Sequence, residues 1–156
     1  PKIIDEVIEP HLFDPAISIT TIAKQISTVD ELKSMTIPKV VFDYNNYALY
    51  FSYSPIPYVK NAKTNLEKVL SAEVYKHIGI YAFSSSAMDQ VRKLKPTDLE
   101  RIEGLEQLRI LENSLKIKIV VTERDSFSVD TPKDLELARK YYNKFLNRQK
   151  RMEKNE

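Results

Sequence analysis

A histidine and a tyrosine four positions apart, His77 and Tyr81, lie in an apolar segment of the sequence. Side chains of an extended strand alternate between its two faces, so the pattern over residues 75–83 places His77, Gly79, Tyr81 and Phe83 on one face. An imidazole and a phenol can bind a sugar hydroxyl or a carboxylate, and Gly79 leaves room for a ligand near the backbone. The alternative is that His77 is a core histidine with satisfied hydrogen bonds and that Gly79 serves packing.

A second polar group lies on a segment with helical periodicity and consists of Glu103, Glu106, Gln107 and Arg109. One interpretation is a surface pair between Glu106 and Arg109, which are three positions apart on a helix. The other is a ring of acid, amide and base that grips a polyhydroxy acid. The residues leave both interpretations open.

Asp130 stands just before the last predicted helix. That helix has Thr131 as N-cap, Pro132 at its first position and Asp134 as the capping-box acid, so the Asp130 carboxylate is not needed as a cap. Ligands of α/β sheets gather at the carboxyl ends of strands, where Asp130 could hold Mg²⁺. The alternative is an aspartate with no role beyond a turn.

The strand over 75–83 needs a sheet and helices around it, because its second face is largely aliphatic. The rest of the sequence predicts those elements and an α/β fold. We expect strands over 16–23 and 116–122, and a hairpin with arms 39–44 and 47–52 around Asn45-Asn46. We expect helices over 2–9, 28–34, 66–70, 84–95 and 97–111, and from 132 onward.

Three details of these helices can be checked directly. Pro10 should end the first helix, which leaves His11 in an exposed loop with a structural role. Gly104 should bend the helical segment over 97–111 or divide it in two. The buried side of that segment is predicted to consist of Leu99, Ile102, Leu105, Leu108 and Leu111.

Tyrosines crowd the hairpin and its proline-rich exit, over residues 39–58. Such a cluster can line a ligand groove, but packing or a subunit contact is the favoured interpretation. We therefore expect this segment to be a protruding arm that supports a homodimer.

Length, charge and composition limit the domain organisation and the classes of partner. A chain of 156 residues suits a single domain, 1–156, and its formal net charge of +2 argues against a dedicated nucleic-acid binder. Residues 139–156 hold seven Lys or Arg and two Glu, which is typical of a solvated terminal helix or tail rather than of a nucleic-acid or membrane contact. Cysteine is absent, and no apolar run reaches the length of a membrane span. We expect a cytoplasmic protein without a membrane partner.

Glycine is scarce, with two residues, Gly79 and Gly104. The chain therefore contains no glycine-rich phosphate loop of either common kind. It also begins within an apparent helix, without an N-cap residue. If the protein uses a nucleotide, the residues that bind its phosphates are not in this chain, and we expect that an N-terminal part is missing.

Four motifs in this order resemble the CMP-Kdo synthetases, which are 3-deoxy-manno-octulosonate (Kdo) cytidylyltransferases. The resemblance extends from about residue 2 to 142 and depends on residues 47–57, 76–83, 105–109 and 129–135. It implies a Rossmann-like, glycosyltransferase-A-type fold with a mixed sheet and flanking helices. It also implies an enzyme that condenses CTP with a keto sugar acid of the Kdo type and releases pyrophosphate, with Mg²⁺ and as a homodimer.

Carried onto this chain, the resemblance implies that His77 and Tyr81 contact the sugar acid and that Glu106 and Gln107 contact its hydroxyls. Asp130 matches the second magnesium-binding aspartate, which gives it a catalytic role.

The chain departs from the family pattern at Tyr53 and Ser84, where relatives carry arginine, and this puts the identity of the keto sugar in doubt. The nucleotide-binding half of the family has no counterpart here, so the chain alone should bind CTP poorly and not turn over. A sugar-acid-binding module without catalysis and a purely structural dimerisation module are the alternatives.

Overall fold

The computed structural model describes residues 2–124, 129, 132 and 135–143, apart from the side chains of residues 68, 70 and 71. The chain forms two compact units, 1–124 and 125–156, and each is described by itself. The predicted single domain over 1–156 stays a prediction.

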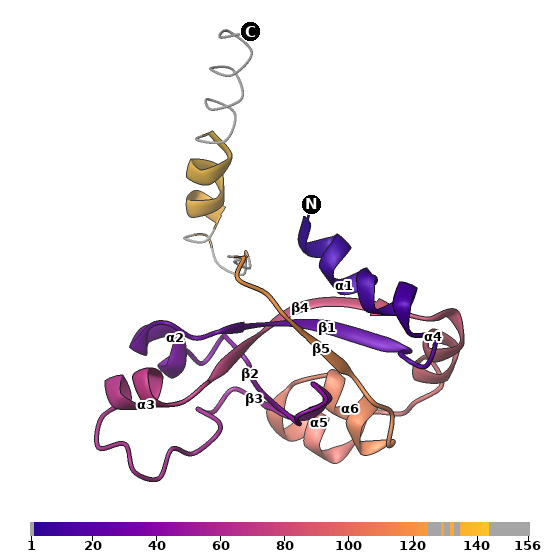
Figure 1. The fold of residues 1–156 in the computed structure, drawn as a ribbon, viewed down its shortest axis with the longest axis horizontal. Coiled ribbons are helices and arrows are strands. Elements are labelled where there is room, and N and C mark those ends of the chain that lie inside the picture. Colours follow the sequence, from indigo (N-terminus) through magenta and orange to yellow (C-terminus); the bar gives the residue numbers. More distant parts are fainter. Residues whose placement is uncertain (1, 125–128, 130–131, 133–134, 144–156) are drawn as a thin grey trace, which may run out of the picture. The chain divides into compact units, whose positions relative to one another are not determined.

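The first unit is built on a five-stranded mixed sheet (Figure 1). Its strands stand in the order β3-β2-β4-β1-β5; all neighbours are antiparallel except β1 and β5, which are parallel. The strands are β1 (Ile19–Gln25), β2 (Lys39–Phe42), β3 (Ala48–Ser52), β4 (Tyr75–Phe83) and β5 (Lys118–Val121). The predicted α/β class is confirmed.

Six helices of this unit flank the sheet or its ends (Figure 1). They are α1 (Lys2–Phe13), α2 (Val29–Lys33), α3 (Asn65–Ser71), α4 (Ser85–Val91), α5 (Asp98–Glu103) and α6 (Gln107–Glu112). One face of the sheet packs against α1 through Val7, Ile22 and Ile78. The other face carries the larger core, in which Leu108 of α6 packs with Phe51. Helices therefore cover both faces, as the aliphatic pattern of β4 predicts.

Helix α1 corrects two predictions, because it continues through Pro10 to Phe13. Proline removes one N–H donor, but tertiary bonds hold the turn around it. Thr20 Oγ1 donates to the Val7 carbonyl at 2.6 Å, and His11 Nε2 lies 3.0 Å from Thr20 Oγ1. The predicted exposed loop at His11 is therefore wrong: this side chain is half-buried and anchors the helix to β1.

The predicted hairpin is confirmed as β2 and β3, with Asn46 at a φ of 57° in the turn. The Asp43 carboxylate accepts from the N–H groups of Asn45 and Tyr47 at 2.9 and 2.8 Å, which closes the loop as an Asx turn does. The tip also pairs with β5, since Tyr47 forms an antiparallel bridge with Lys118. Asparagine at a positive φ and a capping aspartate explain why this segment folds locally.

Hydroxyl side chains cap the starts of three helices. The side chains of Thr28, Thr64 and Ser84 accept from backbone N–H groups in the first turns of α2, α3 and α4. Gly104, at a φ of 67°, separates α5 from α6, as the bend prediction allowed.

The predicted buried stripe of this segment holds for Leu105 and Leu108 but is wrong for Ile102, which is 79% exposed, and for Leu99, which is 37% exposed. Because the left-handed turn at Gly104 rotates the two helices relative to each other, one continuous stripe cannot face the core.

In the second unit residues 135–143 are helical, as predicted, and Leu135 and Tyr142 are exposed. Asp130, Thr131, Asp134 and most of the basic tail over 139–156 lie outside the described residues. None of the helices in the described part of the chain combines the length and apolar content that crossing a bilayer requires. The cytoplasmic location stays a prediction.

Candidate functional site

Strand β4 places three aromatic side chains in a row on the predicted face. The ring centroids of His77 and Tyr81 lie 5.4 Å apart, and those of Tyr81 and Phe83 lie 5.8 Å apart. Phe51 of β3 meets the His77 ring edge-on at 5.0 Å. The face that the alternation predicts is therefore formed, and Phe51 adds a fourth ring from β3, which lies two strands away in the sheet.

Gly79 lies at an irregularity in the pairing of β4 with β1. Thr21 pairs with Tyr81 and the next residue, Ile22, pairs with Ile78, so Gly79 and Ile80 bulge from the ladder. A Cβ added at Gly79 would meet nothing within 4 Å, and the residue is exposed. The protein itself does not crowd this position, so the space predicted beside the backbone is open.

His77 is buried, and its hydrogen-bond partner comes from β1. Its Nε2 lies 2.9 Å from Thr21 Oγ1, and the same hydroxyl donates to the Ile80 carbonyl at 2.9 Å. Burial lowers the pKa of His77 from 6.5 to about 4, so the ring is neutral at physiological pH. The Thr21 hydroxyl has one proton: when it donates to the Ile80 carbonyl, it accepts from His77 Nε2–H and Nδ1 is the acceptor of the ring. This arrangement fits both a core histidine and a ligand contact.

Three buried side-chain atoms of the described region have no hydrogen-bond partner of good geometry: the hydroxyls of Tyr81 and Thr97 and the side-chain nitrogen of Gln107. Two of them, at Tyr81 and Gln107, belong to predicted site residues. Burial raises the pKa of Tyr81; an interaction with the nearby Thr21 hydroxyl opposes this rise, and the negative charge of Glu106 adds to it. The hydroxyl is thus a neutral donor. Because buried donors without partners are costly, they indicate a place where an absent polar group belongs.

Glu106 and Gln107 sit where helix α6 begins, directly after the left-handed turn at Gly104. Glu106 is exposed and Gln107 is buried. Tyr81 packs against the core cluster that contains Leu105 and Leu108, the residues on either side of Glu106 and Gln107, so this turn lies beside the β4 face. Four of the five predicted site residues, His77, Tyr81, Glu106 and Gln107, therefore come from two elements that meet; their roles in binding stay predictions.

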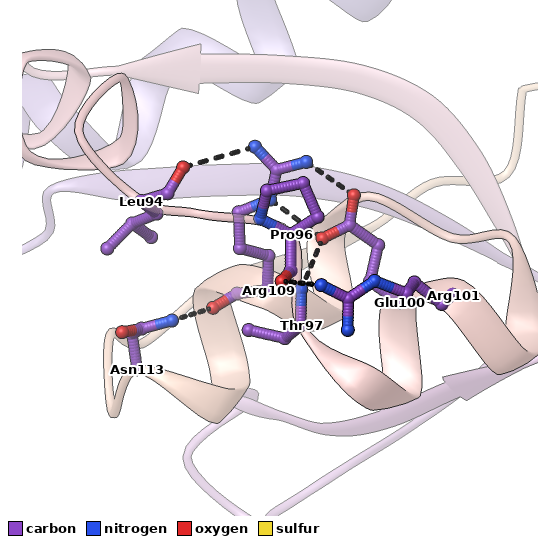
Figure 2. A network of polar contacts seen from close by, with 7 residues as sticks. All are labelled: Leu94, Pro96, Thr97, Glu100, Arg101, Arg109 and Asn113. Atoms are coloured by element: carbon purple, nitrogen blue, oxygen red, sulfur yellow. Dashed lines mark hydrogen bonds and ion pairs between the residues drawn. The ribbon is translucent and has the colours of Figure 1, made fainter.

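Arg109 does not join this group. Its Nε donates to Glu100 at 2.7 Å, its Nη2 pairs with the other oxygen of the same carboxylate, and its Nη1 reaches the Leu94 carbonyl (Figure 2). Glu100 also accepts from the Thr97 N–H at 3.1 Å. The predicted Glu106–Arg109 pair and the predicted ring that includes Arg109 are both wrong, because the capping acid Glu100 takes the guanidinium in bidentate fashion.

The predicted magnesium ligand, Asp130, lies outside the described residues. Within the described part of the chain, no group of three or more His, Asp or Glu side chains is arranged to hold a metal ion. Magnesium binding therefore stays a prediction.

Sequence reasoning missed Thr21 and Phe51, which contact His77 from β1 and β3. The signal at Thr21 was a hydroxyl placed, with that of Thr20, between the apolar residues Ile19 and Ile22, because a buried hydroxyl needs a partner. The contact of Phe51 depends on the register of β3 against β2, which the sequence does not fix.

Comparison with known proteins assigns the chain to a family. A family model described as Cytidylyltransferase matches residues 1–117. The chain belongs to the cytidylyltransferase family. A 3-deoxy-manno-octulosonate cytidylyltransferase of Thermodesulfovibrio yellowstonii is 47% identical to this cytidylyltransferase chain over 134 residues, which cover 82% of the chain and 50% of that relative. The enzyme of the same name from Geobacter sulfurreducens is 41% identical over 140 residues, which cover 87% of the chain and 56% of that relative.

A solved structure described as CMP:2-keto-3-deoxy-manno-octonic acid synthetase complexed with CTP superposes on the cytidylyltransferase chain with a TM-score of 0.81 at 31% identity. The superposition covers 92% of this chain and 56% of that structure. The resemblance read from the four sequence motifs is confirmed. The chain spans about half the length of the curated relatives it matches.

Proposed function

We propose that a protein carrying this chain transfers CMP from CTP to Kdo with release of pyrophosphate, and that this chain supplies the sugar-acid site. The observation that carries the proposal is the pair of buried, unpartnered donors at Tyr81 and Gln107. A sugar acid offers hydroxyl and carboxylate oxygens that satisfy such donors. The names of the relatives and the CTP complex of the structural neighbour support the same reaction.

The residues have separate roles in this proposal. Neutral His77 and the Tyr81 hydroxyl bind and orient the sugar acid from the sheet side. The Glu106 carboxylate and the Gln107 amide bind sugar hydroxyls from the helix side. Positioning of this kind lowers the barrier by fixing the attacking hydroxyl before reaction. Asp130 is proposed as a magnesium ligand with a catalytic role, since a carboxylate suits Mg²⁺, and the metal would screen phosphate charge.

Calorimetric titration of Kdo into the chain tests this function. Tyr81→Phe removes one unpartnered hydroxyl, so we expect about tenfold weaker binding, equivalent to one hydrogen bond, with no loss of thermal stability. Tyr75→Phe is the matched control, since it makes the same change on the same strand, where the hydroxyl donates to Glu73 at the surface at 3.2 Å. Absence of binding heat in the wild-type chain would rule out the sugar-acid site.

We also propose that the chain by itself does not turn over, because its two glycines provide no phosphate loop. Pyrophosphate release from CTP, Kdo and Mg²⁺ should stay at the rate measured without protein. Release at an enzymatic rate would overturn this proposal. A module that binds the sugar acid without catalysis would give the same calorimetric result, but a longer protein containing this chain would then release no pyrophosphate either.

We propose a homodimer that uses the hairpin arm over 39–58. Tyr44 at the turn is fully exposed and Leu49 on β3 is 61% exposed, so the arm offers apolar surface to a second copy. The double substitution Tyr44→Ser and Leu49→Ser should convert a dimer to a monomer in sedimentation velocity, whereas Leu12→Ser on α1 should not. A monomeric wild-type chain at micromolar concentration would exclude this arm as a dimer interface for the chain.

A further inference from the structure

We propose that Glu103 is a positioning residue of the sugar-acid site, whose carboxylate fixes the end of β3 to the turn that carries Glu106 and Gln107. This inference rests on the proposed function, because it assigns a part in binding the same ligand.

The Glu103 carboxylate accepts hydrogen bonds from β3 and the residue after it. Its Oε1 accepts from Ser52 Oγ at 2.7 Å and from the Tyr50 hydroxyl at 3.4 Å, and its Oε2 accepts from the Tyr53 N–H at 3.2 Å. Both oxygens of the half-buried Glu103 carboxylate thus accept hydrogen bonds from residues at one end of β3. Hydrogen bonds to an ionised acceptor are among the stronger ones, so this contact holds its two elements firmly.

Each end of this contact adjoins one side of the site. On the strand side, Ser52 follows Phe51, whose ring meets His77 edge-on at 5.0 Å. On the helix side, Glu103 ends α5 and immediately precedes the left-handed Gly104. The chain then runs directly into Glu106 and Gln107, and α6 packs against β3. The separation between the aromatic face of β4 and the start of α6 therefore depends on Glu103.

Other bonds already hold the local structure on both sides. The Gly104 N–H donates to the Glu100 carbonyl at 2.8 Å, and the Lys39 ammonium donates to the Tyr53 carbonyl at 2.8 Å. Loss of the Glu103 carboxylate would leave these local bonds and the packing of Leu108 with Phe51 in place, and it would remove the hydrogen bonds that Glu103 accepts from the end of β3. We therefore expect the distance between ligand-binding groups to become poorly defined, with the fold retained.

The test is calorimetric titration of Kdo into the chain and three variants. Glu103→Ala should weaken Kdo binding by about tenfold or more, as expected when ligand-binding groups lose their fixed geometry. Glu103→Gln keeps one acceptor oxygen and should recover part of the affinity. Glu112→Ala is the matched control, because Glu112 accepts from the Leu99 N–H within the same helix pair at 3.3 Å and should change the affinity less than about twofold.

Comparison with a core variant distinguishes positioning by Glu103 from a general loss of stability. Ile119→Val, at a fully buried position, should lower thermal stability without changing Kdo affinity measured well below the melting temperature. If Ile119→Val weakens Kdo binding as much as Glu103→Ala does, or if Glu103→Ala binds like the wild type, positioning by Glu103 is wrong. A wild-type chain that does not bind Kdo is a distinct result, because it removes the proposed function together with this role.

Discussion

Replacing Lys39 by methionine is expected to lower the free energy of unfolding of the chain by about 2–4 kcal/mol. Lys39 is completely buried at the start of β2. Its ammonium donates to the carbonyls of Ser34, Ile37 and Tyr53 at 2.6, 2.9 and 2.8 Å. Methionine fills the space of the lysine stem but leaves all three carbonyls without this donor.

The size of the effect follows from opposing contributions. Each carbonyl left without a donor costs about 1–3 kcal/mol if it stays shielded from water. Relief of the lysine's own desolvation offsets part of that cost, and burial does lower the pKa of Lys39. The three carbonyls come from the end of α2, the entry to β2 and the exit of β3. Their loss of a shared donor should therefore loosen both ends of the hairpin together.

Urea denaturation with linear extrapolation measures the change, with Lys118→Met as the matched control. Lys118 also donates to a backbone carbonyl, that of Asn45 at 2.6 Å, but it is half-buried and its partner is a loop. We expect less than about 1 kcal/mol for the control. An equally small loss for Lys39→Met would show that water or local movement satisfies the three carbonyls.

Lys39 also illustrates what the sequence does not show. Lysine is rarely buried, so an alternation pattern assigns it to solvent. The carbonyls that hold it come from residues 34, 37 and 53, and only tertiary structure brings them together. The Arg109 prediction failed in the same way: the helix-surface rule paired Arg109 with Glu106 three positions away, whereas the folded chain pairs it with Glu100 nine positions away.

The features that the sequence did predict are local. The faces of β4, the Asn45-Asn46 turn and the helix starts near residues 28 and 84 each depend on neighbouring residues and appear as expected. The site needed more than local rules, because Tyr81 and Gln107 are far apart in the chain. The resemblance to a family, rather than periodicity, had brought these two residues together, and the structure adds that both carry buried, unpartnered donors.

The second large effect is a loss of stability at acidic pH. We expect His77 to make the native chain lose about 3 kcal/mol of stability as the pH falls from 6.5 to about 4. The folded pKa of about 4 lies below the ordinary value of 6.5 because burial disfavours the charged imidazole. Between pH 6.5 and about 4 the imidazole is protonated in the unfolded chain but stays neutral in the native chain. The stability is therefore fully present above pH 6.5 and is lost progressively toward pH 4.

Carboxylates contribute to acid unfolding as well. The effect of His77 must therefore be measured as the difference in stability between the wild type and a His77 variant. Hydrogen bonds from Thr122 to Glu6 and from Arg109 to Glu100 lower the pKa of both carboxyls, and their stabilisation is also lost as the pH falls. His77→Gln keeps those groups and removes the imidazole. Urea unfolding at a series of pH values should give a wild-type curve that falls about 3 kcal/mol further than that of His77→Gln between pH 6.5 and 4.

Parallel curves for the two proteins would mean that the native ring accepts a proton without cost. His77 would then be an accessible, charged histidine able to pair with a ligand carboxylate, rather than a buried neutral ring that can bind only by hydrogen bonding. The same titration therefore decides what kind of contact His77 can offer. A neutral ring leaves recognition of the sugar acid's charge to other groups, and Tyr53 and Ser84, where the resemblance leads us to expect arginine, are uncharged.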